Sequence, residues 1–241
     1  MPKFFVEPNQ VKDTLIYILG EDAKHIKTVL RSREGDELTL CDGLGMDYFC
    51  RIKALEEGVI AEIISSEPCQ SEPKTKITLY QGLPKADKME LIIQKCVELG
   101  VDRIVPVSTE RCIVKLDRKE EKKLERWQKI AEAAAKQSGR GKIPEIAPKV
   151  LRFSQALAEA KKLSGAIIPY EKEENRGIRS FVENFSGQEI GVFIGPEGGF
   201  TEEEILSAFG AGVLPITLGK RILRTETAGL TTIAILLYEL G

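Results

Sequence analysis

The sequence predicts an α/β protein in which a small N-terminal β-barrel precedes a larger α/β domain with a mostly parallel sheet. Three observations lead to this prediction. Short apolar stretches separated by glycine turns fill the chain up to about residue 66, and apolar β-branched stretches alternate with helical ones beyond residue 76. A segment with two prolines lies between the two patterns. We therefore expect two domains, at residues 1–72 and 73–241.

The N-terminal pattern is a series of short strands interrupted by one helix. The expected strands cover residues 4–6, 15–19, 37–41, 48–52 and 59–64, and the expected helix covers residues 21–30. Gly43, Gly45 and Gly58 supply hairpin turns. Short strands at regular spacing are typical of a small barrel. Because such barrels serve many roles, the barrel alone indicates no function.

The C-terminal pattern alternates strands with helices after a linker at residues 65–76, which contains Pro68 and Pro73. The expected strands cover residues 77–83, 103–107, 166–169, 191–194 and 213–218. The expected helices cover residues 85–99, 120–138 and 153–163, a short stretch from residue 201, and an apolar stretch ending at residue 240. This alternation predicts an α/β domain with a mostly parallel sheet.

Two glycine loops follow two of these strands and organise the domain. Gly195-Pro196-Glu197-Gly198-Gly199 follows the strand at 191–194, and Thr201 before three glutamates is a helix N-cap signature. A second loop, containing Gly219, follows the strand at 213–218. In open α/β sheets ligands bind at the carboxyl ends of the strands, where glycines let the backbone approach closely. The alternative is two ordinary βα turns that bind nothing.

Composition excludes several classes of protein. The chain has 241 residues, 42% of them hydrophobic, which is enough for well-formed cores. No apolar stretch is long enough to cross a bilayer, and the N-terminus resembles a strand more than a signal peptide, so we expect a cytoplasmic protein without a membrane partner. Five cysteines without a CxxC pair are expected to be reduced. A single histidine without converging ligands argues against a metal site.

The formal net charge of −2 lacks the basic excess that is typical of nucleic-acid-binding domains. Cations nevertheless gather locally, at Lys24, Lys27, Arg31 and Arg33, at six positions between 115 and 126, at Arg140 and Lys142, and at Lys220, Arg221 and Arg224. Such patches can bind phosphates while the whole protein stays slightly acidic. The cluster at 115–126 alternates with acids, which is also typical of a solvated helix.

The fingerprints of the common nucleotide-binding and hydrolase families are absent. The chain has neither a G-x-G-x-x-G after a strand nor a G-x-x-x-x-G-K-[ST], and it has neither H-E-x-x-H nor G-x-S-x-G. A nucleoside cofactor would therefore need a different kind of site from a Rossmann crevice.

Two motifs carry a resemblance to a known family. Gly195-Pro196-Glu197-Gly198-Gly199, together with Leu223-Arg224-Thr225-Glu226-Thr227-Ala228, resembles the signature of the bacterial 16S ribosomal RNA uridine-N3 methyltransferases, which belong to the SPOUT class. Further blocks that resemble the family are residues 25–31, Leu83-Pro84-Lys85, Lys88-Met89, Glu98-Leu99-Gly100-Val101, Glu110-Arg111 and Gln137-Ser138-Gly139-Arg140.

This resemblance implies a fold, a cofactor and partners. It implies an N-terminal PUA-like domain that binds RNA, and a SPOUT-type α/β domain with a C-terminal trefoil knot. Composition and periodicity could not have shown a knot, because knotted chains are rare. The resemblance further implies S-adenosylmethionine as the cofactor, 16S ribosomal RNA within the small ribosomal subunit as the substrate, and a homodimer. An apolar C-terminal helix, with Leu230 and residues 233–237, agrees with a dimer interface.

The resemblance also assigns cofactor-binding residues in three loops. They are Ile168 and Pro169 in the first loop, Ile194, Gly195, Pro196, Glu197, Gly198 and Gly199 in the second, and Leu218, Gly219, Ile222, Leu223, Thr225 and Ala228 in the third. Adenine would lie among the apolar side chains with its edge bonded to backbone groups. These apolar residues could equally be plain core packing.

Arg224 and Glu226 are the candidate catalytic residues. Uridine N3 carries a proton that must leave, or whose departure must be stabilised, before the nitrogen accepts a methyl group. Glu226 would take this proton or orient Arg224, and Arg224 would stabilise the uridine anion or contact a phosphate. The alternative is an Arg224–Glu226 ion pair that only holds the loop in place.

The resemblance makes five residues candidates for RNA contact: His25, Arg31, Arg33, Arg111 and Arg140. By itself, His25 fits a packed or capping role better than a catalytic one. Relatives commonly have an acid before the Gln137 block, where this chain has Lys136, which weakens the case for a base there.

Two other functions remain open from the sequence. The first is a non-enzymatic RNA-binding protein that has lost its cofactor, although both glycine loops are present. The second is a methyltransferase that acts on transfer RNA or on a 2′-hydroxyl. A 2′-O enzyme would be expected to have an asparagine in the first loop, where this chain has Pro169-Tyr170-Glu171-Lys172.

Overall fold

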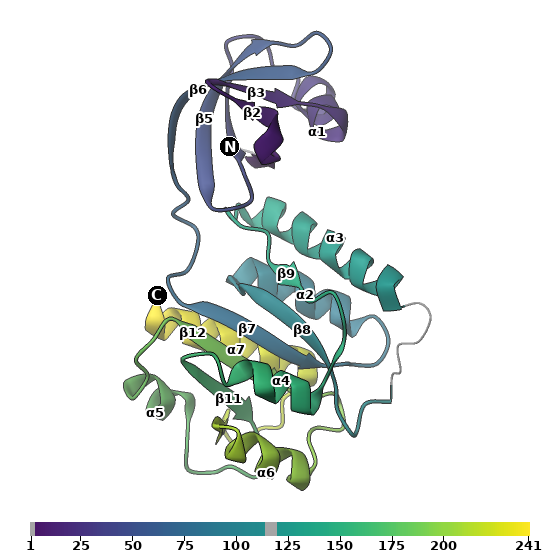
Figure 1. Ribbon diagram of the computed structural model, residues 1–241, viewed down its shortest axis with the longest axis vertical. Helices are drawn as coiled ribbons and strands as arrows, with labels where there is room; N and C mark the ends of the chain where they lie inside the picture. Colours follow the sequence, from purple (N-terminus) through teal and green to yellow (C-terminus); the bar gives the residue numbers. More distant parts are fainter. Residues whose placement is uncertain (1–2, 114–119) are drawn as a thin grey trace. The chain divides into compact units, whose positions relative to one another are not determined.

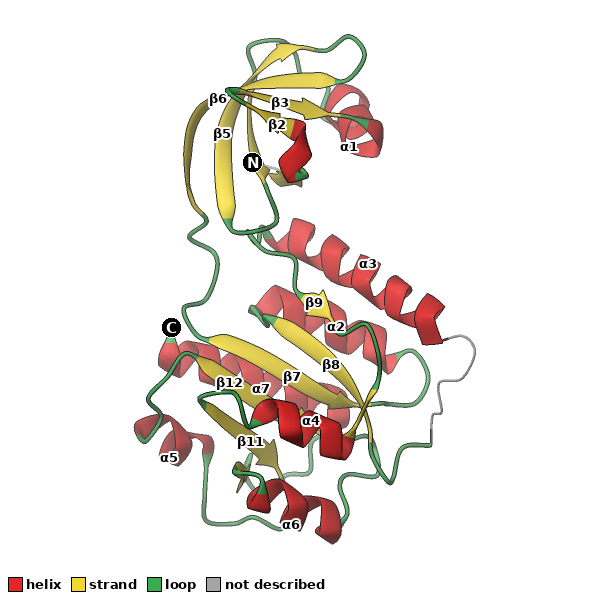
Figure 2. Ribbon diagram, viewed as in Figure 1, coloured by secondary structure: helices red, strands yellow, loops and turns green. Residues whose placement is uncertain are grey.

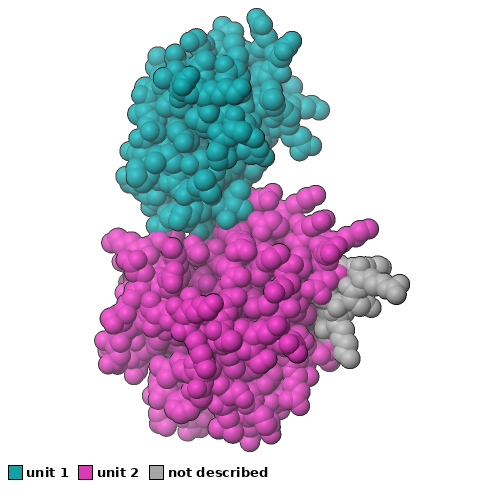
Figure 3. All heavy atoms as spheres, viewed as in Figure 1, with its two compact units in different colours: residues 1–72, 135–143 teal, residues 73–134, 144–241 magenta. Residues whose placement is uncertain are grey.

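The computed structural model describes residues 3–113 and 120–241. The chain divides into two compact units (Figure 3). The first unit comprises residues 1–72 and 135–143, and the second comprises residues 73–134 and 144–241. The chain therefore leaves the first unit after Glu72 and returns to it at Ala135, a return that the sequence pattern did not predict.

The first unit is a curled six-stranded sheet with the strand order β1-β4-β5-β6-β3-β2 (Figure 2). Its strands are β1 (Lys3–Phe5), β2 (Val11–Lys12), β3 (Leu15–Ile18), β4 (Glu37–Cys41), β5 (Met46–Ala54) and β6 (Val59–Pro68). Neighbouring strands are antiparallel except for β1 and β4, which are parallel. Two register shifts between β5 and β6 bend this long pair, which helps the sheet to close over its apolar side.

The helix expected over residues 21–30 is present over residues 20–29, but it is irregular. After a short 3-10 turn at Pro8–Gln10, α1 spans Gly20–Lys24 and continues as a π-helical turn over His25–Val29. Arg31 has a φ of 54°, a left-handed conformation that ends the helical stretch. Ala23 and Ile26 are buried in the core of the first unit, so the helix is anchored by one narrow apolar face.

The second unit contains the predicted α/β domain with a parallel sheet (Figure 1). Its strands are β7 (Lys76–Gly82), β8 (Arg103–Ser108), β9 (Glu145–Ile146), β10 (Leu151–Arg152), β11 (Gly165–Pro169), β12 (Glu189–Ile194) and β13 (Val213–Ile216). Its helices are α2 (Lys88–Leu99), α3 (Glu120–Ser138, whose last residues belong to the first unit), α4 (Phe153–Ala160), α5 (Ile178–Glu183), α6 (Glu202–Gly210) and α7 (Thr225–Leu240). The short elements β9, β10 and α5 were not predicted from the sequence.

The strand order brings the two glycine loops together. The order is β10-β8-β7-β12-β11-β13, with β9 beside β8, and the paired strands run parallel. β12 lies between β7 and β11, and its residues after Glu189 are buried, as is typical of a strand that is covered on both faces. The loops after β11, β12 and β13 therefore emerge at one edge of the sheet.

Aromatic side chains fill the core on one face of the sheet. Phe193 of β12 stacks on Tyr80 of β7, with ring centroids 4.4 Å apart, and Phe153 of α4 lies edge-on to Phe193. Phe200, just after the glycine loop, packs against Phe153. The loop after β12 is therefore anchored at its far end by the core.

Helix α7 follows the edge strand β13 but packs against α2 and the middle strands β7 and β12. Thr225, Gly229, Ile233 and Leu236 are buried on its inner side, whereas Tyr238 is exposed. None of the helices in the described parts of the chain has the length and apolar character needed to cross a membrane.

Candidate functional site

The loop after β12 needs glycine at several positions. A Cβ on Gly195 would lie 3.1 Å from the backbone of Gly199, and Gly199 itself has a φ of 66°. Across the loop, a Cβ on Gly82 at the end of β7 would lie 2.7 Å from Pro196. The N–H of Gly199 donates to the carbonyl oxygen of Pro196 over 2.9 Å. These close approaches produce a tight turn that presents backbone, not side chains, at the sheet edge.

The end of the loop after β13 is joined to the loop after β12 by a partly buried hydrogen bond. Thr225, the first residue of α7, donates its hydroxyl to the carbonyl oxygen of Gly195 over 2.6 Å. The same hydroxyl accepts from Nε2 of Gln81, on β7, over 3.0 Å. Gln81 is fully buried, and its Oε1 has no hydrogen-bond partner among the described residues. Sequence reasoning missed Gln81, whose only signal was a polar residue near the end of an apolar strand.

A cluster of charges lies on the same two loops and on α2. Nζ of Lys88 is 2.9 Å from Oε1 of Glu197 and 3.4 Å from Oε2 of Glu226. The backbone N–H of Lys85 donates to both carboxylate oxygens of Glu197 over 3.2 Å. Burial by itself would raise the pKa of Glu197, but these hydrogen bonds lower it below its ordinary value. The hydrogen bond to Glu197 in turn raises the pKa of Lys88, and the charge of Glu226 adds to this effect.

The Arg224–Glu226 ion pair that the sequence left open as an alternative is not formed in this cluster. Glu226 pairs with Lys88, and no ion pair joins it to Arg224 within the part of the chain that the structure describes. Arg224 is the N-cap residue of α7, and its side chain is exposed. Lys88 lies in one of the blocks that resemble the family, but the sequence indicated no role for it.

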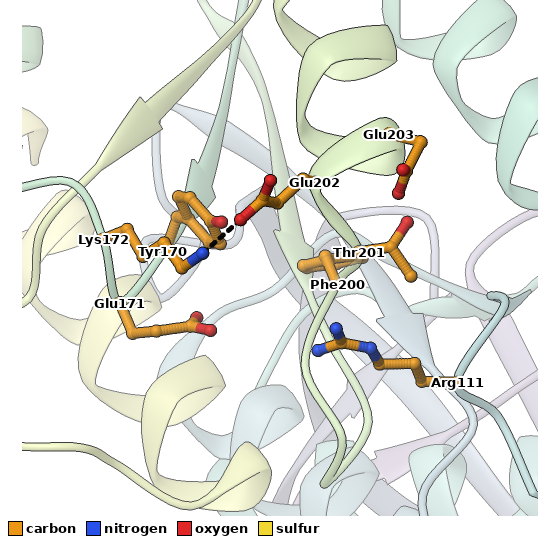
Figure 4. Close-up of a pocket in the computed structure, with 8 residues that line it drawn as sticks. All are labelled: Arg111, Tyr170, Glu171, Lys172, Phe200, Thr201, Glu202 and Glu203. Carbon is orange, nitrogen blue, oxygen red and sulfur yellow. Dashed lines mark hydrogen bonds and ion pairs between the residues drawn. The ribbon is translucent and has the colours of Figure 1, made fainter.

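A pocket of about 250 Å³ opens beside the glycine loop (Figure 4). Its walls are residues 170–172 after β11, residues 200–203 at the start of α6, and Arg111. Nη1 of Arg111 donates to the carbonyl oxygen of Gly198 over 2.8 Å. The carboxylate of Glu171 lies 3.9 Å from the point where a Cβ on Gly199 would stand. The loop after β11 therefore lies close to the loop after β12.

The start of α6 follows the predicted capping pattern. The hydroxyl of Thr201 accepts the N–H of Glu204 over 3.1 Å, and the carboxylate of Glu204 accepts the N–H of Thr201 over 3.0 Å. Glu204 also accepts the N–H of Glu110, over 2.9 Å. This capping box fixes the direction in which the chain leaves the glycine loop.

The predicted cofactor-binding residues gather at this sheet edge with different exposures. Ile168, Ile194, Pro196 and Thr225 are buried, whereas Pro169, Gly195, Gly199, Leu218, Leu223 and Ala228 are partly buried. Glu197, Gly198, Gly219 and Ile222 are exposed. Ile222 has 89% of its surface exposed, so it does not line an apolar pocket in this structure.

The candidate RNA-binding residues are placed in different ways. In the first unit, His25, Arg31 and Arg33 are not buried, and the His25 ring lies edge-on to Phe4 with centroids 5.6 Å apart. In the second unit, Arg111 is exposed beside the pocket. Of the predicted cation cluster at 115–126, Lys115, Arg118 and Lys119 lie outside the described residues.

Arg140 is placed differently from the expectation that it contacts RNA. Its side chain is 4% exposed, and its Nη2 lies 2.7 Å from Oε2 of Glu72. Its Nε donates to the other oxygen of Glu72 over 3.3 Å. Glu72 also accepts the N–H groups of Gly141 and Lys142. The guanidinium therefore serves a buried ion pair within the first unit instead of facing solvent.

The five cysteines are free, with Cys41, Cys50 and Cys96 buried. Across residues 3–113 and 120–241, no group of three or more His, Cys, Asp or Glu side chains is placed to hold a metal ion.

A parallel sheet with three loops converging at its carboxyl edge, two of them containing glycine, is typical of a ligand-binding enzyme domain. Residues 70–237 match the family model described as an RNA methyltransferase domain, and residues 18–64 match the RNA methyltransferase PUA domain. The chain belongs to this family of RNA methyltransferases.

Named relatives resemble the chain over nearly its whole length. The ribosomal RNA small subunit methyltransferase E of Bacillus subtilis is 34% identical over 99% of this chain and 97% of the relative. The enzyme of the same name from Mesomycoplasma hyopneumoniae is 35% identical over 95% of this chain and 96% of the relative. The crystal structure of such an enzyme from Neisseria gonorrhoeae, bound to S-adenosyl methionine, has a TM-score of 0.84 at 37% identity and covers 99% of this chain and 97% of that chain.

Proposed function

We propose that this protein transfers a methyl group from S-adenosylmethionine to N3 of a uridine in the 16S ribosomal RNA of the small ribosomal subunit. The observation that carries the proposal is the convergence of the loops after β11, β12 and β13, with bare glycine backbone at Gly195 and Gly199. Relatives named for methylation of small-subunit ribosomal RNA, and one crystallised with the cofactor, support it.

The residues at this edge fit the chemistry of the proposed cofactor. The partly buried Leu218 and Leu223 offer apolar surface for an adenine ring, and Ile168 and Ile194 are buried at the ends of β11 and β12. At Gly199 the nearest atoms to an added Cβ are the carboxylate oxygens of Glu171, 3.9 Å away, which leaves room for a ligand to approach the backbone there. Carboxylates at the edge, such as that of Glu171, suit the hydroxyl groups and the positive charge that S-adenosylmethionine carries.

The protein itself must remove the N3 proton and position the uracil ring of the substrate. S-adenosylmethionine supplies a methyl group on a cationic sulfur, which is already activated for transfer. In our proposal the carboxylate of Glu226 accepts the N3 proton at one of its oxygens, and the exposed guanidinium of Arg224 stabilises the uridine anion. Holding the reactants in line contributes up to about 7–11 kcal/mol in ideal cases.

We further propose that residues 217–241 complete a trefoil knot. Two observations support this proposal. Helix α7 follows the edge strand β13 yet packs on the middle strands β7 and β12, so the chain must cross the carboxyl edge of the sheet. At this crossing the hydroxyl of Thr225 donates a hydrogen bond to the carbonyl oxygen of Gly195 in the loop after β12. Knots are rare exceptions to chain topology, and here the knot would hold the three loops of the site together.

We also propose that the first unit is a PUA-like barrel that binds RNA, and that the enzyme is a homodimer. His25, Arg31 and Arg33, which are not buried, are the side chains that would contact RNA in this unit. For the dimer, the support is the exposed apolar surface of α7, where Ile235 and Tyr238 face solvent.

Methyl transfer to isolated small ribosomal subunits tests this function. The purified protein is incubated with isotopically labelled S-adenosylmethionine and subunits from a strain that lacks the protein, and the ribosomal RNA is digested to nucleosides. Label in 3-methyluridine of 16S RNA is the expected result. Label in a 2′-O-methyl nucleoside, or in transfer RNA only, would overturn the proposed specificity. Absence of both transfer and cofactor binding in calorimetry would favour a non-enzymatic RNA-binding protein.

A further inference from the structure

Lys88 occupies a special place at the proposed site because its ammonium lies between two carboxylates from different loops. It is the first residue of α2, Glu197 belongs to the loop after β12, and Glu226 belongs to the first turn of α7. The Nζ–Oε distances are 2.9 Å to Glu197 and 3.4 Å to Glu226. The Lys88 side chain is 30% exposed and that of Glu226 only 16%, so this contact is partly shielded from solvent.

The main chains of the two loops do not depend on Lys88. Thr225 ties the start of α7 to Gly195 over 2.6 Å, and Gln81 ties Thr225 to β7. Glu197 is held independently by the backbone N–H of Lys85, which donates to both of its carboxylate oxygens. Removing the ammonium of Lys88 should therefore leave the loop backbones where they are.

The side chain of Glu226, by contrast, does depend on Lys88. Its Oε2 is buried and accepts no hydrogen bond from the described residues, so the ammonium of Lys88 is its ion-pair partner there. Without this ammonium, the carboxylate would face the negative charge of Glu197 with no cation between them. Rotation of Glu226 away from this position would then relieve the repulsion.

We propose that Lys88 is a positioning residue for methyl transfer, whose ammonium bridges Glu197 to Glu226 and holds the Glu226 carboxylate where it accepts the uridine proton. This inference rests on the proposed function, because it assigns Lys88 a task only through Glu226. Lys88 itself need not touch the substrate or the cofactor. Its substitution should therefore affect the rate of transfer and not the binding of the cofactor.

The first experiment compares Lys88→Met, which removes the charge at similar length, with Lys88→Arg, which keeps it. Lys88→Met is expected to lower the turnover number for methyl transfer by about 10- to 100-fold, with a cofactor dissociation constant in calorimetry within about threefold of wild type. Lys88→Arg should recover most of the lost rate. The matched control is Lys95→Met, which removes another ion-paired lysine of α2, 2.8 Å from Glu98, and should retain the wild-type rate.

The second experiment asks whether Lys88 acts through Glu226. Lys88→Met is combined with Glu226→Gln, and the rate lost on removing the lysine is compared in the two backgrounds. We expect a large loss where Glu226 is present and almost none in the Glu226→Gln background, because a neutral amide leaves no carboxylate to hold. Lys88→Gln is measured in parallel, so that poor folding of one variant does not decide the outcome.

The outcomes separate this inference from the proposed function. An equal loss of rate in both backgrounds, or a loss of cofactor affinity that parallels the loss of rate, would overturn the positioning role of Lys88. A normal rate for Lys88→Met together with a slow Glu226→Gln would overturn it too, while the proposed function stands. A normal rate for Glu226→Gln would overturn both the proposed role of Glu226 and the inference built on it.

Discussion

The hydroxyl of Thr225 donates a hydrogen bond to the carbonyl oxygen of Gly195 over 2.6 Å and thereby joins two loops that lie thirty residues apart in the chain. The same hydroxyl accepts from the buried amide of Gln81 over 3.0 Å. One side chain thus connects strand β7, the glycine loop and the start of α7. The geometry of the proposed cofactor site depends on this junction.

Thr225→Val should therefore damage both stability and cofactor binding. The substitution keeps the side-chain shape but takes a hydrogen-bond partner from the Gly195 carbonyl and from the Gln81 amide, at a cost of about 1–3 kcal/mol in the free energy of unfolding. Denaturant titration and calorimetry with S-adenosylmethionine measure the two effects. Thr232→Val is the matched control, because that buried hydroxyl donates to Ala228 within its own helix. Equal cofactor affinities in the two variants would contradict a special role for Thr225.

Gly198→Val should abolish cofactor binding while the first unit stays folded. A Cβ at Gly198 would already lie 3.1 Å from Cβ of Arg111, and a branched side chain adds bulk where the backbone is expected to meet the cofactor. Calorimetry measures the loss. Gly210→Val, where no atom lies within 4 Å of the added Cβ, should bind normally. Unchanged affinity of Gly198→Val would mean that this loop does not line the site.

Arg224→Ala and Glu226→Gln should separate catalysis from cofactor binding. We expect both variants to bind S-adenosylmethionine with an affinity within a few fold of wild type, and to transfer methyl groups about 10²-fold more slowly. The methyl-transfer rate of both variants should recover as the pH rises, because uridine N3 then loses its proton without help from the protein. A rate deficit that stays constant with pH would count against proton transfer to Glu226 and favour RNA positioning.

The Glu72–Arg140 pair should make the stability of the first unit depend on pH. Burial by itself would raise the pKa of Glu72, but the Arg140 guanidinium and the N–H groups of Gly141 and Lys142 hold this pKa below its ordinary value of 4.5. A lowered pKa stabilises the fold at pH values above the unfolded-state pKa, and this contribution disappears as the pH falls through the folded-state pKa.

Glu72→Gln tests this dependence. Because it removes the carboxylate that is paired with the nearly buried guanidinium of Arg140, the variant should lose about 3 kcal/mol of stability at pH 7. The difference in stability between wild type and the variant should narrow as the pH falls from 4.5 through the lower folded-state pKa of Glu72, because Glu72 then takes up its proton in the folded state as well. Thermal melting followed by circular dichroism between about pH 3 and 7 measures it. If the difference in stability between wild type and Glu72→Gln stays the same across this pH range, the charge of Glu72 is not what stabilises the unit.

Dimerisation should be required for activity. The exposed apolar side chains of α7, among them Ile235 and Tyr238, are expected to be covered by a second copy. Light scattering at micromolar concentration should report the dimer mass, and Tyr238→Glu should yield an inactive monomer. Full activity of a monomer would contradict this prediction.

Local patterns were enough to predict much of the second unit. The β-branched stretch before Gly195 predicted β12, and the Thr201 signature predicted the start of α6. That a ligand binds at the two glycine loops stays a prediction. Each of these features depends on residues that are close in the sequence, where turn and capping preferences act directly.

Contacts between distant residues could not be predicted in the same way. Lys88 meets Glu197 and Glu226 only because β7 and β12 are neighbours in the sheet, and Arg140 is buried only because residues 135–143 return to the first unit. From the sequence alone, these charged residues fit an exposed position or a catalytic role as well as they fit the ion pairs that they form. The order of the strands and the return of residues 135–143 to the first unit depend on packing between distant segments. The periodicity of the sequence carries no information about such packing.

Nucleoside mass spectrometry of 16S ribosomal RNA from a strain without this protein tests the central claim most directly. We predict the loss of 3-methyluridine at one position, its return when the wild-type gene is supplied, and no return with the Glu226→Gln variant. If 16S RNA from the deletion strain keeps its full content of 3-methyluridine, the protein does not methylate N3 of that uridine, and the proposed function is wrong.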